Sequence, residues 1–494
     1  MIPSHWKSFS RIDGPLKATG ILLNRSVRQL RFLFMAICAV VTITNLAAIY
    51  SLPSWFDEAF FANMSFNVAE GKGLIFTLIP GYHTGEVYFY GPIFFYLQSF
   101  FINLLGLDSF IFRLPILVSA NLIVLLLVLV LRNNGVATRY QLLFAVAAML
   151  DVSFNRSAVN GRMDLIAVML ISLALFLTGR RREVLEQTGV FRWLLVGAFS
   201  AMAYLVTPRS LFLLPVVLIL STYQLLFEGA NFIALRNWRL ITIGLVGFLA
   251  TAWLWIQYTG GIAAYVELFK RNPDTASHMA VTFFRTPLAN VPIVMMLILV
   301  VSNYKVAIGN VLLIGSISSY IVFSLIVKEN GPYAGMITPF VLMTIVGVLE
   351  RVSWTKAQKS ALITVLLLPG SVHLTLRATD LYLNSGCRER SAVAAIRSQQ
   401  FRNGDVIVAP YKYYFLLQGV GHDVVTLDRS KIDPTQVLAK ADLLVENELA
   451  VSALPASGYV KVASLSCNIR RVPLFPSNFY ERTIFNESFY RRAR

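Results

Sequence analysis

Residues 53–92 read P-S-W-F-D-E-A-F-F-A-N-M-S-F-N-V-A-E-G-K-G-L-I-F-T-L-I-P-G-Y-H-T-G-E-V-Y-F-Y-G-P and directly follow a first apolar run at 32–51. The stretch gathers carboxylates, a histidine and tyrosines: Asp57, Glu58, Glu70, His83, Glu86, Tyr88 and Tyr90. Ionisable groups are costly beside a bilayer and usually have a role there. Residues 53–92 therefore predict a functional site at a membrane surface.

Composition places the chain among membrane proteins. Its 494 residues are 56% hydrophobic and 14% charged, with a mean hydropathy of +0.64, whereas soluble domains carry about 25% charged residues. The net charge of +17 comes without a basic run interleaved with aromatics. Loop Lys and Arg that obey the positive-inside rule explain it. We expect a polytopic α-helical protein whose partners include membrane lipids and no nucleic acid.

The apolar runs predict about eleven membrane spans, because a span needs about 20 apolar residues. The predicted spans are 32–51, 110–131, 139–155, 164–179, 193–208, 210–227, 239–257, 288–304, 306–327, 334–350 and 360–377. Residues 92–107 are only about four turns long and contain Gln98 and Asn103. We interpret them as a helix that lies in the membrane interface.

Charge predicts the orientation. Segments 1–33, 132–139, 180–192, 228–239, 305 and 351–359 hold eighteen Lys and Arg, and the opposite loops hold eight. The richer side is the cytoplasmic one. If 92–107 crossed the membrane, the Arg180–Arg182 run would lie outside. The basic tail at 1–31 lacks the apolar core of a cleavable signal and is predicted to stay in the cytoplasm.

Three regions follow: a tail at 1–31, a transmembrane region at 32–378 and an extracytoplasmic α/β domain at 379–494. The first outer loop spans 52–109. In the C-terminal region, strand-like runs at 405–410, 422–428 and 442–447 alternate with helix-like segments at 388–401, 411–418 and 433–441. It has no glycine-rich phosphate loop. Outside the cytoplasm a Cys387–Cys467 disulfide can form, but spacing alone does not decide whether it does.

Asp57 and Glu58 allow two interpretations. Ser54 and Asp57 have the S-x-x-D spacing of a helix N-terminal box, with Ser54 as the cap. Both acids would then only complement a helix dipole. Their position directly after a span, at a membrane surface, favours a functional role.

An ordered set of short motifs carries a resemblance. It runs D-E-A at 57–59, Y-F-Y-G-P at 88–92, L-L-G-L-D-S-F-I-F-R-L-P at 104–115 and R-M-D at 162–164. This order, over about residues 32–260, resembles the GT-C superfamily of polyprenyl-phosphate-sugar glycosyltransferases. The most similar group is that of protein O-mannosyltransferases and aminoarabinose transferases.

The resemblance implies that Asp57 is the general base and Glu58 a supporting or acceptor-positioning acid. Tyr88 matches a tyrosine on the donor side. The family often has His or Lys before the motif proline, where this chain has Gly91, and His83 is the nearest substitute. A solitary histidine in a loop is more often solvated than bound to a ligand.

Cations are needed to hold a departing phosphate. Arg162 and Asp164 could form a local ion pair or contact the phosphate or sugar, and Arg209 lies between two spans with almost no loop around it. The loop at 257–287 resembles the lid of this family. Its basic residues are Lys270, Arg271, His278 and Arg285. With no D-x-D motif and no His/Cys cluster of ligand spacing, no cofactor is predicted and a divalent metal has no support.

The implied activity is inverting transfer of a sugar from a polyprenyl-phosphate donor to a hydroxyl of a lipid, glycan or protein acceptor. The active site would face outward from the inner (plasma) membrane. The alternative is a multi-pass transporter or lipid flippase. Transporters usually carry ionisable groups at mid-span, and the predicted spans are nearly free of charge at their centres.

Overall fold

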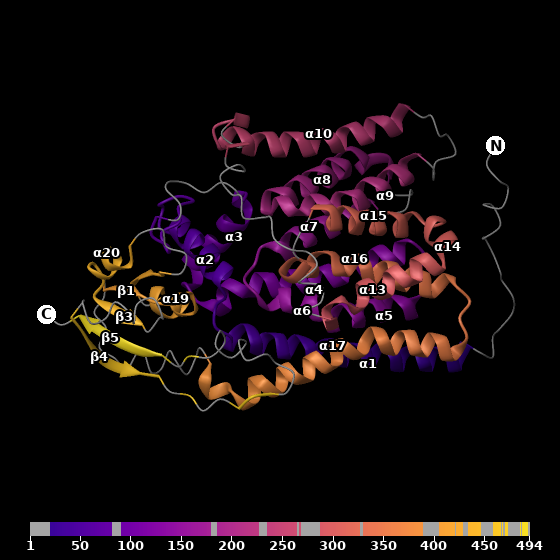
Figure 1. The fold of residues 1–494 in the computed structure, drawn as a ribbon. Coiled ribbons are helices and arrows are strands. Elements are labelled where there is room, and N and C mark those ends of the chain that lie inside the picture. The colour runs from indigo at the N-terminus through magenta and orange to yellow at the C-terminus, as the bar shows by residue number, and fades with distance from the viewer. Residues whose placement is uncertain are drawn as a thin grey trace.

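A computed structural model describes residues 20–81, 90–178, 185–226, 235–263, 266–267, 287–326, 330–388, 405–419, 421–427, 433–445, 458–465, 467, 470–472, 485 and 487–492. Long helices run side by side and form one part of the molecule (Figure 1). A small sheet caps one end of the helices, next to α2 and α3. The helices α1 and α17 lie along one edge of the bundle, and α10 lies along the opposite edge.

Every predicted span coincides with a helix or with a pair of consecutive helices. The helices of this part are α1 (Gly20–Ser51), α2 (Phe56–Ala69), α3 (Pro92–Leu105), α4 (Ser109–Asn133), α5 (Thr138–Leu150), α6 (Val152–Val159), α7 (Asp164–Thr178), α8 (Leu185–Val206), the 3-10 helix η3 (Pro208–Leu213), α9 (Leu214–Leu226), α10 (Leu235–Tyr258), α13 (Pro287–Ser302), α14 (Tyr304–Ile308), α15 (Val311–Ile326), α16 (Asn330–Arg351) and α17 (Lys356–Leu383).

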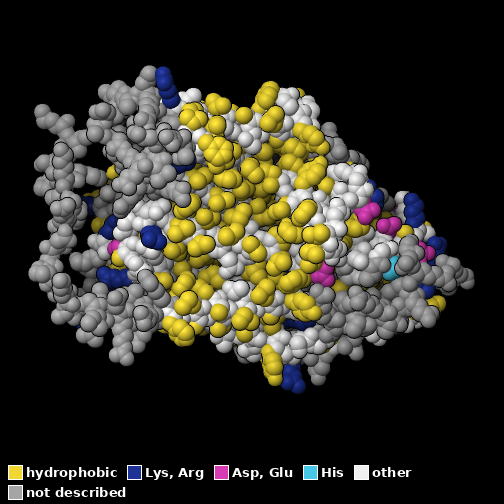
Figure 2. Space-filling model, turned by 180° about the vertical axis from the view of Figure 1, so that it is seen from behind, with side chains coloured by type: hydrophobic (Ala, Val, Ile, Leu, Met, Phe, Trp, Pro, Cys, Tyr) yellow, Lys and Arg dark blue, Asp and Glu magenta, His cyan; other side chains and the backbone are white. Residues whose placement is uncertain are grey.

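An apolar belt surrounds the helices. Five helices of the described residues are long and apolar enough to cross a membrane, and the bent pair α5–α6 makes a sixth. Hydrophobic side chains cover the middle of the molecule in Figure 2, and charged side chains gather toward its two ends. Exposed leucines and valines on α10 and α13, such as Leu249, Leu254 and Val301, are part of this apolar surface. Such a band is what a bilayer would cover.

The predicted span at 139–155 is not one straight helix. Helices α5 and α6 meet at Asp151 with a bend of 58°. The carboxylate of Asp151 accepts a hydrogen bond from Phe154 N (2.8 Å), so Asp151 acts as an N-cap and starts a new helix. This cap is the physical reason for the break.

The start of α2 also differs from the prediction. Trp55, not Ser54, is the N-cap residue. The hydroxyl of Ser54 instead donates to the carbonyl of Tyr411 (2.9 Å). The third helical residue is therefore Glu58, whose carboxylate accepts from Trp55 N (3.1 Å). The helix begins one residue later than predicted because Ser54 is used in a long-range contact.

The C-terminal part contains a five-stranded sheet of order β2-β1-β3-β5-β4. Its elements are η4 (Ser385–Cys387), β1 (Val406–Val408), η5 (Tyr411–Tyr413), α19 (Tyr414–Gln418), β2 (Asp423–Val425), α20 (Pro434–Leu438), β3 (Leu443–Val445), β4 (Tyr459–Ser464) and β5 (Ser488–Arg492). The three predicted strands are β1, β2 and β3, which pair in parallel. The strands β4 and β5 were not predicted and pair antiparallel. The predicted helix at 388–401 lies outside the described residues.

The sheet and the helices share one hydrophobic core. Alternation along the strands sends Ile407 and Leu443 into the large core, which also holds α2 residues, and sends Val408 and Leu444 into a small cluster with α20. The backbone of Thr426 donates to the carbonyl of Leu78 (2.8 Å) in the first outer loop. The sheet therefore packs against α2 and the loop that follows it, and stabilises their position.

A disulfide joins Cys387, at the end of α17, to Cys467. Their Cα atoms are 5.6 Å apart, within the range that a disulfide requires. This pairing was left open by the sequence. It ties the segment after β4 to the end of the longest helix after α1.

Candidate active site

Asp57 lies in the first turn of α2, directly after the end of α1. Its side chain is 36% exposed, and its Oδ2 accepts from Arg162 Nη1. Carboxylates are favoured at a helix N-terminus because of the helix dipole. Figure 1 shows α2 at the end of the bundle where the sheet packs, and Asp57 is the second residue of this helix.

Arg162 connects two carboxylates. It lies between α6 and α7, is 4% exposed, and donates from Nε to Asp164 Oδ2 at 2.8 Å as well as to Asp57. Burial alone would lower the pKa of the Arg162 guanidinium, but the charges of Asp164 and Asp57 outweigh it and raise that pKa above its ordinary value. Arg162 is therefore a permanent cation that orients Asp57.

Arg209 adds a second cation to the site. It lies in η3 and is half-buried. Its guanidinium lies 4.2 Å from the ring centroid of Tyr333, and that of Arg162 lies 4.9 Å from the same centroid. Arg209 Nη1 also contacts the hydroxyl of Tyr90 (3.3 Å). Within the described part of the chain, Arg209 forms no ion pair with a carboxylate, although Asp164 acts on it electrostatically.

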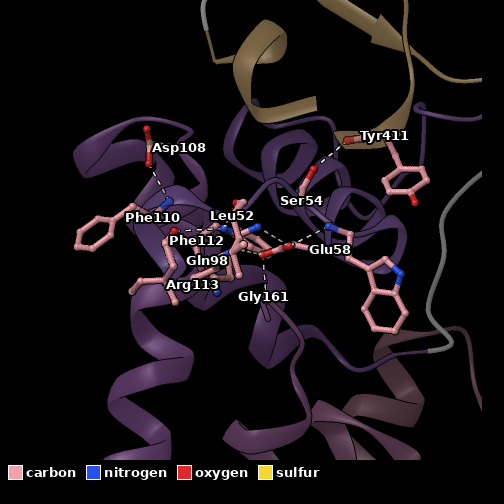
Figure 3. Close-up of polar contacts among 12 residues, drawn as sticks. Leu52, Ser54, Glu58, Gln98, Asp108, Phe110, Phe112, Arg113, Gly161 and Tyr411 are labelled. Atoms are coloured by element: carbon pink, nitrogen blue, oxygen red, sulfur yellow. Dashed lines mark hydrogen bonds and ion pairs between the residues drawn. The ribbon is translucent and has the colours of Figure 1, made fainter. Parts of the chain in front are cut away.

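Glu58 lies beside Asp57 but is built into the protein interior. Arg113 donates to its carboxylate from Nε (2.5 Å) and Nη2 (2.8 Å), and both side chains are 1% exposed. Gly161 N (2.9 Å) donates to Oε1, and Trp55 N (3.1 Å) donates to Oε2. Figure 3 shows these bonds converging on Glu58 from different segments. Glu58 thus fixes the residue before Arg162 to the start of α2.

Arg113 extends this network to α1. Its Nη1 donates to the carbonyls of Ile49 (3.1 Å) and Leu52 (2.5 Å), which lie at the C-terminal end of that helix. Asp108 caps α4 by accepting from Phe110 N (2.8 Å), and Gln98 of α3 donates to the carbonyl of Phe112 (2.8 Å). The ends of α1, α2, α3 and α4 are therefore joined around one buried ion pair.

The structure brings together four of the predicted site residues, and Glu58 lies directly behind them. The four are Asp57, Arg162, Asp164 and Arg209. The remaining predicted residues lie outside the described residues: His83, Tyr88, Lys270, Arg271, His278 and Arg285.

Sequence reasoning did not assign Tyr333, Arg113 or Gly161 to the site. The sequence around Tyr333 fits either a cavity wall or, preferably, a charged turn at the mouth of another predicted span. The ring centroid of Tyr333 lies 4.9 Å from the guanidinium of Arg162 and 4.2 Å from that of Arg209. The motif at 104–115 contained Arg113, but nothing local indicates that its partner is 55 residues away. Among the described residues, no group of three or more His, Cys, Asp or Glu could hold a metal ion.

The bundle of apolar helices, with a carboxylate after the first of them, defines a class. The chain shares its fold with solved structures of ArnT and of the arabinofuranosyltransferase AftD, which fits the GT-C resemblance of the sequence motifs. It is similar over 94% of its length to ArnT from Cupriavidus metallidurans in the apo state, with a TM-score of 0.64, 12% identity and 98% of that chain covered. The same protein bound to undecaprenyl phosphate matches with a TM-score of 0.57 and 13% identity, over 93% of this chain and 97% of that one.

A third similar structure is the arabinofuranosyltransferase AftD from Mycobacteria. It has a TM-score of 0.52 and 14% identity, and the match covers 94% of this chain but 40% of AftD. No protein-family description matches the sequence, and no curated protein matches it. The likeness is therefore one of fold, and with ArnT it extends over nearly the whole of both chains.

Proposed function

We propose that the protein is an inverting glycosyltransferase that moves a sugar from a polyprenyl-phosphate donor to an acceptor hydroxyl. The observation that carries this proposal is the environment of Asp57. One carboxylate oxygen is bound by Arg162, and Oδ1 accepts no hydrogen bond from any described residue. A half-exposed carboxylate held in one orientation, with an open oxygen, suits a general base.

In the proposed reaction the acceptor hydroxyl attacks the anomeric carbon of the sugar. Asp57 Oδ1 takes the hydroxyl proton, the bond from the anomeric carbon to the phosphate oxygen breaks, and its electron pair leaves with the polyprenyl phosphate. The negative charge that develops there needs a fixed cation. Arg209 supplies it in this proposal, because it is half-buried, is held against Tyr333 and has no described carboxylate partner.

Glu58 takes the supporting role. Both of its oxygens accept hydrogen bonds from Arg113 and backbone N–H groups. Glu58 therefore acts by fixing the position of Arg162 relative to Asp57. The relative position of these groups matters because a small displacement of a reacting group can lower the reaction rate strongly.

The remaining donor contacts are proposed from the sequence. His83, Tyr88, Lys270, Arg271, His278 and Arg285 would complete the donor site from the first outer loop and the lid. Gly260 and Gly261 lie near the start of the lid with φ of +94° and +93°, a conformation that favours glycine. Two such residues in succession suit a hinge.

A polyprenyl phosphate is the proposed donor lipid because the similar ArnT structure contains undecaprenyl phosphate. We place the active site and the C-terminal sheet outside the cytoplasm, in the inner membrane, with residues 1–31 inside. Two observations support one shared side. Helix α2, whose first turn contains Asp57, lies at the same end of the bundle as the sheet in Figure 1, and the sequence puts most Lys and Arg of the loops on the other side.

The bend between α5 and α6 is the observation that favours a transporter, since broken helices often form transport sites. Such sites lie near the bilayer midplane. Here α6 ends at Val159, three residues before Arg162, and so it leads into the cluster around Asp57. A glycosyltransferase explains that cluster, whereas transport does not require it.

The test is incubation of the purified protein with a panel of polyprenyl-phosphate sugars and acceptors, with release of free polyprenyl phosphate as the readout. Release with at least one donor is expected. Movement of labelled lipid across a liposome membrane without release, for every donor, would replace the proposal with the transporter.

Arg209→Gln should weaken donor binding about tenfold or more, because a hydrogen bond between charged groups contributes about 1.5–3 kcal/mol. Arg139→Gln is the matched control. Arg139 is exposed and lies in the first turn of α5, which follows the C-terminal end of α4, whereas Arg113 lies near the N-terminal end of α4. Equal donor affinity in the two variants would move the phosphate site away from Arg209.

A further inference from the structure

A second basic cluster lies on the side of the bundle formed by α1, α6 and α17. Helix α17 is apolar enough to span a membrane and most of its surface is exposed, yet its C-terminal half contains His373 and Arg377, both half-buried. Charged side chains within spans are rare, and they usually have a partner or mark a site. This pair of residues is not used by the proposed reaction.

A ladder of amides holds Arg377 in place. Asn45 of α1 accepts from Arg377 Nη1 (3.3 Å) and donates from Nδ2 to Asn155 Oδ1 of α6 (2.7 Å). Asn155 in turn donates to the carbonyl of Met149. Both asparagines are buried, so the guanidinium of Arg377 is held in place by hydrogen bonding to a buried amide pair.

The cluster has an excess of positive charge. Arg156 follows Asn155 along α6, is exposed, and acts electrostatically on both Arg377 and His373. The nearest carboxylate on α17 is Asp380, which is already bound by Arg388 and by Asn384 Nδ2 (2.9 Å).

Arg377 binds no carboxylate among the described residues. The Nε2 atom of His373 is buried and has no hydrogen-bond partner there. Arg377 therefore experiences opposite electrostatic effects, repulsion from Arg156 and attraction to Asp380.

We propose that this cluster binds the phosphate of an anionic membrane lipid, between Arg156 and Arg377. Guanidinium groups bind phosphate oxygens with charge-assisted hydrogen bonds, and a phosphate there would offset the repulsion between the two arginines. His373 and Asn45 complete the polar wall. Exposed apolar side chains on the same two helices, including Ile43, Val365 and Leu368, offer a surface for acyl chains.

The site is separate from the proposed donor site. The ring of Trp55 contacts one arginine of each site, with the guanidinium of Arg156 5.6 Å from its centroid and that of Arg162 6.0 Å from it. Arg377 is six residues before the end of α17, about 9 Å along the helix. This depth suits the phosphate plane of a lipid leaflet, where arginine side chains reach the headgroups.

The test measures lipids retained by the full-length protein in detergent, by native mass spectrometry, with added dioleoylphosphatidylglycerol. Phosphatidylcholine and inorganic phosphate are the comparison probes. We expect the wild type to retain phosphatidylglycerol preferentially and Arg156→Gln and Arg377→Gln each to weaken its binding about tenfold. Arg377→Lys should keep part of the affinity. Lys440→Gln, a change of an exposed cation in the sheet region, should leave it unchanged.

Equal retention of phosphatidylglycerol by the wild type and by both Gln variants would overturn the proposal. So would equal retention of phosphatidylcholine, because that lipid has no net negative charge. Retention of inorganic phosphate that matches that of phosphatidylglycerol would mean a free phosphate rather than a lipid as the ligand, and would also overturn the proposal. Arg156 is exposed, so its variant should fold and decides the outcome if Arg377→Gln aggregates.

Discussion

The buried pair of Glu58 and Arg113 gives the strongest prediction about stability. Both side chains are 1% exposed, and removal of one partner leaves the other charge buried without compensation. Such a change costs about 3–5 kcal/mol. We therefore expect Glu58→Gln to lower the free energy of unfolding by about 3–5 kcal/mol, and Arg113→Gln by a similar amount.

The double variant separates this account from simple additivity. Glu58→Gln with Arg113→Gln leaves neither charge uncompensated, so its cost should fall below the sum of the single costs by about 2 kcal/mol or more. Arg351→Gln is the matched control, since its pairing with Glu350 is long (3.7 Å) and more exposed. Its cost should stay near 0–1 kcal/mol.

Chemical unfolding in mixed micelles, followed by tryptophan fluorescence, measures these free energies. Donor turnover in the same preparations reports on position: Glu58→Gln should lower it about 10²-fold, because Gly161 and Trp55 are then held less firmly. The reasoning would be refuted if each single variant lost less than about 1 kcal/mol of unfolding free energy, the two losses were additive, and turnover were unchanged.

Two further changes test particular contacts. Gly161→Ala would place a methyl group 2.5 Å from a Glu58 carboxylate oxygen, and the displacement of that carboxylate should lower turnover and the free energy of unfolding, the latter by about 1–3 kcal/mol. Gly386→Ala is the control, because no atom lies within 4 Å of the added methyl group. Equal effects of the two changes on turnover would contradict the prediction. Cys387→Ser breaks a disulfide with a sequence separation of 80, so thermal denaturation should show a loss of about 4 kcal/mol by loop-closure entropy. Cys38→Ser, a change of a free cysteine, should leave the melting temperature nearly unchanged, and a similar loss in both would argue against the cross-link as the cause.

The sequence predicted the helices well because apolar runs report burial or lipid contact directly. The predicted spans and cytoplasmic segments leave Asp57, Arg162 and Arg209 all on the outer face, since alternating spans determine which loops share a side. These inferences need only the order and length of the runs. The structure places all three around one tyrosine ring and one ion pair.

Other features depend on contacts between distant residues. Arg113 meets Glu58 across 55 positions, and Gly161 meets it across 103; no local pattern encodes such pairs. Ser54 left its predicted cap because Tyr411, far along the chain, accepts its hydroxyl. The strands β4 and β5 pair across intervening residues and have no hairpin signal. The helix cap at Asp151, by contrast, depends only on neighbouring residues. The sequence could have indicated it, but the span at 139–155 was predicted without a break.

The most direct test of the central claim is single-turnover release of polyprenyl phosphate by Asp57→Asn. The isosteric change removes the base but leaves Arg162 in place, so release should fall by about 10²–10⁴. Donor affinity should be kept or increased, because one negative charge near the phosphate is lost. Asp433→Asn, at an exposed helix cap, should behave as the wild type. Turnover by Asp57→Asn at the wild-type rate, with the donor bound, would contradict the assignment of Asp57 as the base.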